Sequence, residues 1–471
     1  GVFGFSLLWL TFLNIFLGVF IAFVFFGKRT RRIGQNIDAH TFPEFLGKRF
    51  DSKFIQKFVG LIIFIFMPVY TAAVMIGVTK FLESGLGIDY NIALLAFAVI
   101  VAAYVLFGGM KGVMYTDAFQ GSLMLIGMTA LLLFVYVKLG GVVSAHRQLT
   151  DMFADPVVKE QTAGLQAGGF QGWTSMPVLF SKYWWTVVST IVMGVGIGVL
   201  AQPQLAVRFM TVKSDREINR AIPIGGVFII MMTGVAFVVG SLSNVLFFQT
   251  DGKIAVAAAG GVTDSVIPMF LDKFMPEWFI TVFLIILLAA GMSTISSQYH
   301  AIGTAVGRDI FSVKDHGSAK GMVISRIGVL IALVLTVVLS FVLPGIWDGA
   351  IAISTSLFFG LCGSSFLPMF FGALYFKKMT KPAALAGMLT GFAASALWMM
   401  FVHSKESVVL KICDLLFGVP TLSPKGSMLE FVDPIIVALP LAIIVTFVVQ
   451  LVSSKKKQFS DKHIQECFKG I

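Results

Sequence analysis

The stretch Leu288–Ser297 reads LAAGMSTISS and forms a polar patch inside an apolar segment of membrane-spanning length, residues 278–303. On a helix, four of its residues recur at i, i+3, i+4 and i+7 and share one face: Ala290, Ser293, Thr294 and Ser297. Hydroxyls and a backbone carbonyl are neutral oxygen ligands, which suit a small monovalent cation and carry too little charge to hold a divalent one. The alternative is that each hydroxyl only bonds back to a carbonyl of its own helix, or lets helices pack closely. Three hydroxyls on one stripe favour a cation site.

The composition predicts a membrane protein. Hydrophobic residues make up 57% and charged residues 13% of the 471 residues, and the mean hydropathy is +0.91. Apolar stretches of about 20 residues can cross a bilayer, and they should be helical because an open strand cannot satisfy its backbone hydrogen bonds in lipid. We therefore expect an all-α integral membrane protein, with residues 1–452 as one transmembrane domain and 453–471 as a tail. The sequence contains eleven such stretches: 3–26, 57–79, 90–107, 117–138, 183–206, 220–246, 277–303, 322–344, 350–376, 382–402 and 434–452.

Basic residues are concentrated on one side of these spans. If the first span runs inward, most of the 35 Lys and Arg residues fall on the cytoplasmic side, as the positive-inside rule describes. We therefore expect an outside amino terminus and a cytoplasmic carboxyl terminus in a multi-pass protein of the cell membrane. The net charge of +11 requires no nucleic-acid partner, because anionic membrane lipid accounts for it.

The sequence shows no sign of an enzyme. Cys362, Cys413 and Cys467 lie far apart without metal-ligand spacing, so we expect neither a disulfide framework nor a zinc site. It contains no glycine-rich phosphate loop, no Ser/His/Asp set and no paired carboxylates in a membrane context. We expect no soluble catalytic or signalling domain in the short tail 453–471.

Asp117 is the one obvious carboxylate within the predicted spans. It follows residues 108–116, where we expect a loop that turns the chain back into the membrane. A charge at a helix centre costs roughly 2.5–3.5 kcal/mol on insertion scales, so its presence requires a reason. Asp117 either caps the amino terminus of the following helix or faces the bundle interior and supplies charge to a cation site.

The span 183–206 is the most irregular of the eleven. Glycines at alternate positions weaken a helix, and Pro203 removes a backbone hydrogen bond. A discontinuous helix near the bilayer midplane is the best sequence indicator of a transporter's substrate site, although glycines also serve close helix packing. The predicted substrate-binding residues are Gly194, Gly198, Gln202 and Gln204. The small residues of 354–365 predict either a hinge or close packing.

Two motifs together resemble the sodium/solute symporter family. The first is Ala290-x-x-Ser293-Thr294, followed by Ser296-Ser297 and by GRDIF at 307–311. The second is GGMKGVMYTDAFQ at 108–120. The segment 202–210 (QPQLAVRFM) is similar to the proline and pantothenate branches, and the resemblance extends from residue 1 to about residue 452.

This resemblance implies a LeuT-type fold of two five-helix repeats with inverted topology. The span 3–26 would be the second core helix, 183–206 the broken sixth and 277–303 the eighth. The first core helix would be missing, so that the chain would be truncated at its amino terminus and its site incomplete.

The resemblance also implies sodium as the coupling ion. The shared sodium site would use the carbonyl of Ala290 and the hydroxyls of Ser293 and Thr294. A second sodium, present in some members, would use Asp117, Ser296 and Ser297. The expected function is sodium-coupled import of a small organic solute by alternating access. The alternatives are a solute sensor or structural module of the same fold, or a proton-coupled symporter.

Overall fold

The structure is a computed structural model that describes residues 1–311, 319–347, 349–454 and 459–471, with the backbone alone at 106–116 and 319–320. Every regular element in these described ranges is helical. One shorter apolar helix, Tyr90–Val105, and ten segments of membrane-spanning length match the eleven predicted spans. The ten are Gly4–Asn36, Lys53–Leu86, Asp117–Lys138, Lys182–Thr211, Asp215–Asp251, Glu277–Ile310, Gly321–Ile346, Ala350–Tyr375, Lys381–Phe401 and Pro434–Ser453.

The first segment is a continuous helical rod of changing pitch. It comprises η1 (Gly4–Leu7), α1 (Leu8–Leu13), the π-helical η2 (Asn14–Gly27) and α2 (Lys28–Asn36). Two short capped turns then lead into α3 (Phe42–Arg49) and α4 (Lys53–Leu86). Thr41 and Ser52 cap these helices, because their hydroxyls accept the backbone N–H of Glu44 and of Ile55.

The helix α5 (Tyr90–Lys138) carries two predicted spans that run in opposite directions along α16 (Glu277–Thr304). We call Tyr90–Val105 the first arm of α5 and Asp117–Lys138 the second arm. On the first arm, Phe97 lies against Gly291 and Val105 lies near Gly303, so this arm runs parallel to α16. On the second arm, Gly127 packs against Ile286, and later residues join the cluster around the first turns of α16. The chain direction therefore reverses between the two arms. The loop expected over 108–116 is not found, because the backbone is helical through these residues.

The fifth predicted span is interrupted as expected. It passes through α9 (Lys182–Trp185), the π-helical η4 (Thr186–Val195), α10 (Gly196–Gly198) and the 3-10 turn η5 (Val199–Ala201). Gln202 is extended, with φ −68° and ψ 126°, and Pro203 then starts α11 (Pro203–Thr211). Proline suits a first helical position, where its missing N–H would have no partner anyway.

The remaining elements complete the bundle. After α5 come α6 (Val142–Asp151), η3 (Met152–Ala154), α7 (Pro156–Gln161) and α8 (Ala163–Ala167). After the broken span come α12 (Asp215–Ile229), η6 (Ile230–Gly234), α13 (Val235–Asp251), α14 (Ala255–Ala258), η7 (Thr263–Ser265) and α15 (Val266–Phe274). After α16 come η8 (Ala305–Ile310), α17 (Ala319–Ile346), α18 (Ala350–Tyr375), α19 (Lys381–Phe401), α20 (Ser404–Leu410), α21 (Ile412–Phe417), η9 (Met428–Glu430), α22 (Pro434–Ser453) and α23 (Asp461–Cys467).

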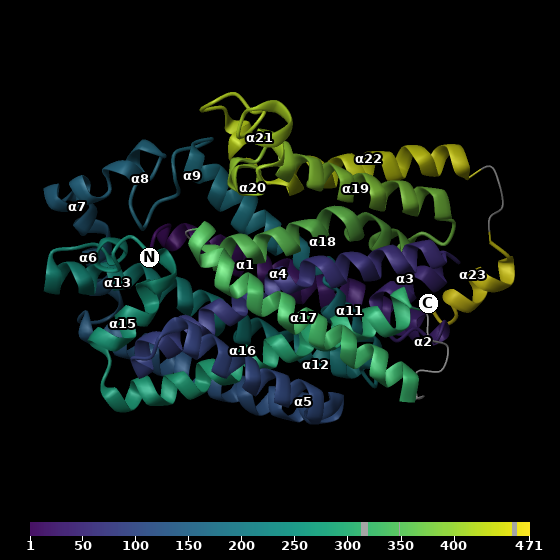
Figure 1. The fold of residues 1–471 in the computed structure, drawn as a ribbon, viewed down its shortest axis with the longest axis horizontal. Coiled ribbons are helices and arrows are strands. Elements are labelled where there is room, and N and C mark those ends of the chain that lie inside the picture. The colour runs from purple at the N-terminus through teal and green to yellow at the C-terminus, as the bar shows by residue number, and fades with distance from the viewer. Residues whose placement is uncertain (312–318, 348, 455–458) are drawn as a thin grey trace.

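The long helices run roughly along one axis between two ends of the molecule (Figure 1). One end carries α2, α3 and α23, and the other carries α6, α7, α8 and α15; we call them the α23 end and the α6 end. The most buried long helix is α18, which packs against α19, α4, α22 and the broken span. A Cβ at Gly198 would lie 2.1 Å from the carbonyl oxygen of Phe359, so α18 touches the broken span backbone to backbone.

The tail after α22 packs onto the bundle through α23. Asn36 donates side-chain hydrogen bonds to the carbonyls of Cys467 (3.2 Å) and Lys469 (2.9 Å), and Phe468 lies against the guanidinium of Arg49. Arg49 is fully buried and also donates to the carbonyls of Ala373 and Phe376 near the end of α18. The tail thus joins the α23 end of the bundle.

Candidate functional site

The hydroxyl stripe of α16 lies on the less buried face of that helix. Ala290, Ser293, Thr294 and Ser297 are all partly exposed. The opposite face, with Gly291 and Ile295, is buried, and a Cβ at Gly291 would come within 2.4 Å of Val78 on α4. Packing against α4 and α5 therefore fixes the rotation of α16 and leaves the stripe free to contact another group.

The four hydroxyls between residues 293 and 297 all bond back to their own helix. Ser293 and Thr294 both donate to the carbonyl of Ala290 at 3.0 Å. Ser296 donates to the carbonyl of Ser293 (3.1 Å), and Ser297 donates to that of Thr294 (2.8 Å). This is the back-bonding weighed above as the alternative, and it is compatible with cation binding. A hydroxyl that donates its hydrogen keeps two lone pairs, and a cation is coordinated by lone pairs.

Asp117 pairs with a basic side chain of α11, the helix that follows the break in the broken span. Its Oδ2 lies 3.1 Å from Nη2 of Arg208 on α11. Its Oδ1 is buried, and no described residue donates a hydrogen bond to it. A capping carboxylate would accept a backbone N–H, so the capping role is not the one seen here. Asp117 thus offers one engaged oxygen and one buried, unpartnered oxygen.

Asp117 is level with the predicted partners of the second sodium site. The second arm of α5 is antiparallel to α16, and Gly127 faces Ile286, whose Cδ1 would be 2.5 Å from a Cβ at Gly127. Ten residues before Gly127 lies Asp117, and ten residues after Ile286 lies Ser296. Equal rise on two antiparallel helices puts Asp117 and Ser296 at the same depth. Ser296 is fully buried, whereas Ser297 belongs to the exposed stripe.

The four residues predicted for substrate differ in what surrounds them. Gly198 brings the broken span against the backbone of α18, and a Cβ at Gly194 would lie 3.9 Å from each carboxylate oxygen of Asp433. Both glycines are buried, which fits the packing alternative. Gln202 and Gln204 instead flank the break, and Gln202 Nε2 and Gln204 Oε1 are buried without a described hydrogen-bond partner. The two amides are therefore the polar groups available at the break.

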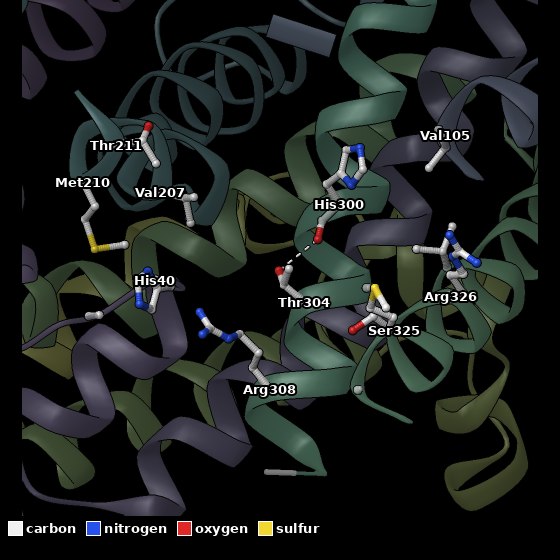
Figure 2. A pocket seen from close by; sticks show the side chains of 15 residues that line it. His40, Val105, Val207, Met210, Thr211, His300, Thr304, Arg308, Ser325 and Arg326 are labelled. Atoms are coloured by element: carbon white, nitrogen blue, oxygen red, sulfur yellow. Dashed lines mark hydrogen bonds between the residues drawn. The ribbon is translucent and has the colours of Figure 1, made fainter. Parts of the chain in front are cut away.

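A cavity of about 510 Å³ begins at His300, one turn of α16 beyond the stripe, and lies toward the α23 end. Figure 2 shows His300 and Thr304 on the next turns of α16, with Arg308 and His40 beyond them and Val207 and Met210 of α11 on the facing wall. Nε2 of His300 is buried and has no partner among the described residues. The cavity thus lies between α11 and the turns of α16 that follow the hydroxyl stripe, and no stripe residue lines it.

Sequence reasoning did not assign a role to Asp309 of the GRDIF motif. Asp309 is fully buried and accepts hydrogen bonds from Thr41 Oγ1 (2.9 Å) and Gln56 Nε2 (2.8 Å), while Arg308 lies 3.6 Å from Glu44. These contacts tie the end of α16 and η8 to α3 and α4 at the α23 end. The motif itself was the available signal, because a carboxylate in an apolar segment needs partners.

A second group of ionisable residues, buried except for the half-buried Lys405, lies near the carboxyl-terminal end of α19. It comprises His403, Lys405, Glu406 and Asp433. His403 Nδ1 bonds Glu406, and the backbone N–H of Asp433 donates to Ser189 Oγ on η4 (3.0 Å). Burial raises the pKa of Asp433 to about 6. Burial alone would lower the pKa of His403, but the adjoining Glu406 carboxylate raises it above its ordinary value.

Comparisons with known proteins point to one family of transporters. The sequence profile described as the sodium:solute symporter family matches residues 2–391. Sodium/proline symporter 2 of Staphylococcus saprophyticus is 27% identical over 420 residues, which cover 86% of this chain and 75% of the relative. The osmoregulated proline transporter OpuE of Bacillus subtilis is 29% identical over 417 residues, covering 87% and 78%.

Among solved structures, the chain is similar to a Na⁺-coupled sialic acid symporter in a substrate-bound outward-open state. The TM-score is 0.68 at 18% identity, with 97% of this chain and 85% of that chain covered. At this identity the likeness concerns the fold, and it confirms the LeuT-type bundle expected above.

Proposed function

Because this chain belongs to the sodium:solute symporter family, and so couples solute import to sodium rather than catalysing a reaction, we propose that its solute is a small carboxylate-bearing molecule, with proline the first candidate. Three of its relatives are proline transporters of staphylococci and bacilli, which supports that choice. Other amino acids, pantothenate and short monocarboxylates share the carboxylate and are the alternatives.

The partly exposed hydroxyl stripe is the observation that best supports a sodium-coupled mechanism. On α16, Ser293 and Thr294 present oxygen lone pairs on a partly exposed face. One turn farther along α16, at His300, the cavity begins that α11 lines on its other side. We propose that the carbonyl of Ala290 and the hydroxyls of Ser293 and Thr294 contribute to the shared sodium site. The solute would lie at the break, where Nε2 of Gln202 can donate to a carboxylate and Oε1 of Gln204 can accept from a solute N–H.

The second sodium site is proposed around Asp117. Its buried Oδ1 has no described partner, and it lies at the depth of Ser296 and Ser297. One anion offsets much of the cost of desolvating one cation, so this set of residues fits sodium. Arg208 competes for the same carboxylate, and its side chain is 57% exposed. The exposed guanidinium can therefore turn toward solvent when sodium takes its place beside the carboxylate.

Coupling follows from linkage between these sites. Sodium must favour the state that also binds solute, which is a coupling free energy between two sites. A membrane potential adds about 2.3 kcal/mol per charge per 100 mV, so two sodium ions contribute roughly twice what one does. The positive-inside bias supports a cytoplasmic α23 end, and the 510 Å³ cavity would then be the release route.

Uptake by the full-length protein in proteoliposomes tests the proposal. A sodium gradient, a proton gradient and no gradient are imposed in parallel, with labelled proline, pantothenate and lactate as solutes. We expect proline accumulation only under the sodium gradient. Accumulation driven equally by protons would favour the proton-coupled alternative, and solute binding without flux would favour the sensor. If only pantothenate or lactate accumulates, the choice of proline is wrong.

A further inference from the structure

An apolar groove of about 850 Å³ lies between η2, α18 and α22. Its walls are almost entirely hydrocarbon, and four of its apolar side chains are strongly exposed: Phe371 (42%), Phe376 (58%), Ile443 (51%) and Phe447 (63%). The deep end of the groove reaches Leu200 in η5, immediately before the break at Gln202. None of the residues placed in the sodium or solute sites lines it.

The end of the groove is basic. Lys377 and Lys378, both exposed, line the groove where α18 ends at the α23 end of the molecule. The ammonium of Lys377 lies 5.6 Å from the ring of Phe468, and no acidic side chain pairs with either lysine among the described residues. The lining itself contains no Asp or Glu. A ligand with an apolar body and an anionic end would match this distribution.

The length of the groove matches one leaflet of a bilayer. On α22 it extends from Leu439 to Gln450. Eleven residues of α-helix rise about 16 Å, which is about half of a hydrocarbon core roughly 30 Å thick. The apolar part thus has the length of one extended acyl chain, and the lysines lie at the depth of the headgroups.

We propose that this groove binds an acyl chain of an anionic phospholipid from the leaflet at the α23 end, with its phosphate on Lys377 and Lys378. Basic pockets between transmembrane helices bind anionic headgroups in this way. Because the acyl chain would lie against both η5 and α18, the lipid would bridge the broken span and α18, the helix on which that span packs.

The proposal is tested on the purified full-length protein in nanodiscs, with phosphatidylglycerol or phosphatidylcholine that carries the same photoreactive acyl chain. We expect phosphatidylglycerol to label α18 and α22 within the groove and phosphatidylcholine to label it several-fold less. Each lysine near an anionic surface contributes roughly a five-fold effect, so Lys377→Gln with Lys378→Gln should lower phosphatidylglycerol labelling by about 30-fold. Lys53→Gln with Lys57→Gln removes two exposed lysines of α4 as the matched control and should leave labelling unchanged.

A second pair of variants tests the apolar part with both lysines intact. Ile443→Trp partly fills the groove and should reduce labelling, whereas Ile444→Trp, at a 57% exposed neighbour outside the lining, should not. Free glycerol 3-phosphate should not compete, because it lacks the chain. Thermal unfolding of each variant shows that the bundle is folded. Equal labelling by both lipids would make the occupant an ordinary boundary lipid and overturn the proposal. Absence of groove labelling, or competition by glycerol 3-phosphate, would overturn it as well.

Discussion

Gly198→Ala separates a packing role for this glycine from a role in solute binding. The new Cβ would lie 2.1 Å from the carbonyl oxygen and 2.5 Å from the carbonyl carbon of Phe359. A real Cβ contact is essentially never shorter than 3.0 Å, so the broken span or α18 must move by about 1 Å. Overpacking of this kind costs about 1–3 kcal/mol, against a gain of about 1 kcal/mol from the better helix propensity of alanine.

Gly226→Ala is the matched control. Gly226 lies within α12, and a Cβ there meets nothing within 4 Å, so only the propensity gain of about 1 kcal/mol applies. Thermal unfolding in detergent, followed by tryptophan fluorescence, should place Gly226→Ala at or above the wild type and Gly198→Ala below it. The Gly198 variant should also import more slowly with an unchanged apparent solute affinity. A Gly198→Ala protein as stable as Gly226→Ala, but with weakened solute binding, would refute the packing argument.

Three further predictions concern ionisable and hydroxyl groups. Ser293→Ala removes one proposed sodium ligand and should raise the sodium concentration for half-maximal uptake at least several-fold, whereas a hydroxyl that only bonds back to Ala290 would leave it unchanged. Asp117→Asn should lower the sodium Hill coefficient toward one in uptake assays, and a wild-type coefficient would make the carboxylate a partner of Arg208 alone. Because the folded-state pKa of Asp433 is raised from 3.8 to about 6, its contribution to stability falls as pH rises through this window. Asp433→Asn should therefore gain in unfolding temperature relative to the wild type between about pH 4 and pH 7, and a pH-independent difference would contradict the assignment.

The membrane spans and the break were predictable because they depend on local sequence. Hydropathy over about 20 residues defines a span. A proline that follows alternating glycines interrupts a helix whichever elements that helix packs against. The pairing of Asp117 with Arg208 was not predictable, since 91 residues separate them and only the fold of the second α5 arm brings them together. The role of Gly198 depends in the same way on Phe359, which a single sequence does not connect with it.

The hydroxyl stripe shows a different limit of sequence reasoning. Periodicity placed the four residues on one face, and the structure agrees. Periodicity does not indicate which way a hydroxyl rotates, and back-bonding to Ala290 became visible only with coordinates. Coordination of sodium by these hydroxyls stays a prediction, which the Ser293 variant tests.

The burial of Arg49 has a consequence for the order in which this chain is assembled. Its guanidinium binds carbonyls of residues made 324 and 327 positions later, and its ring contact, Phe468, comes later still. At roughly 5–20 residues per second, translation takes about 16–65 s to supply the first of these carbonyls. During that interval the guanidinium of Arg49 lacks these protein partners. The α23 end can therefore close only after the end of α18 and the segment around Phe468 have been synthesised.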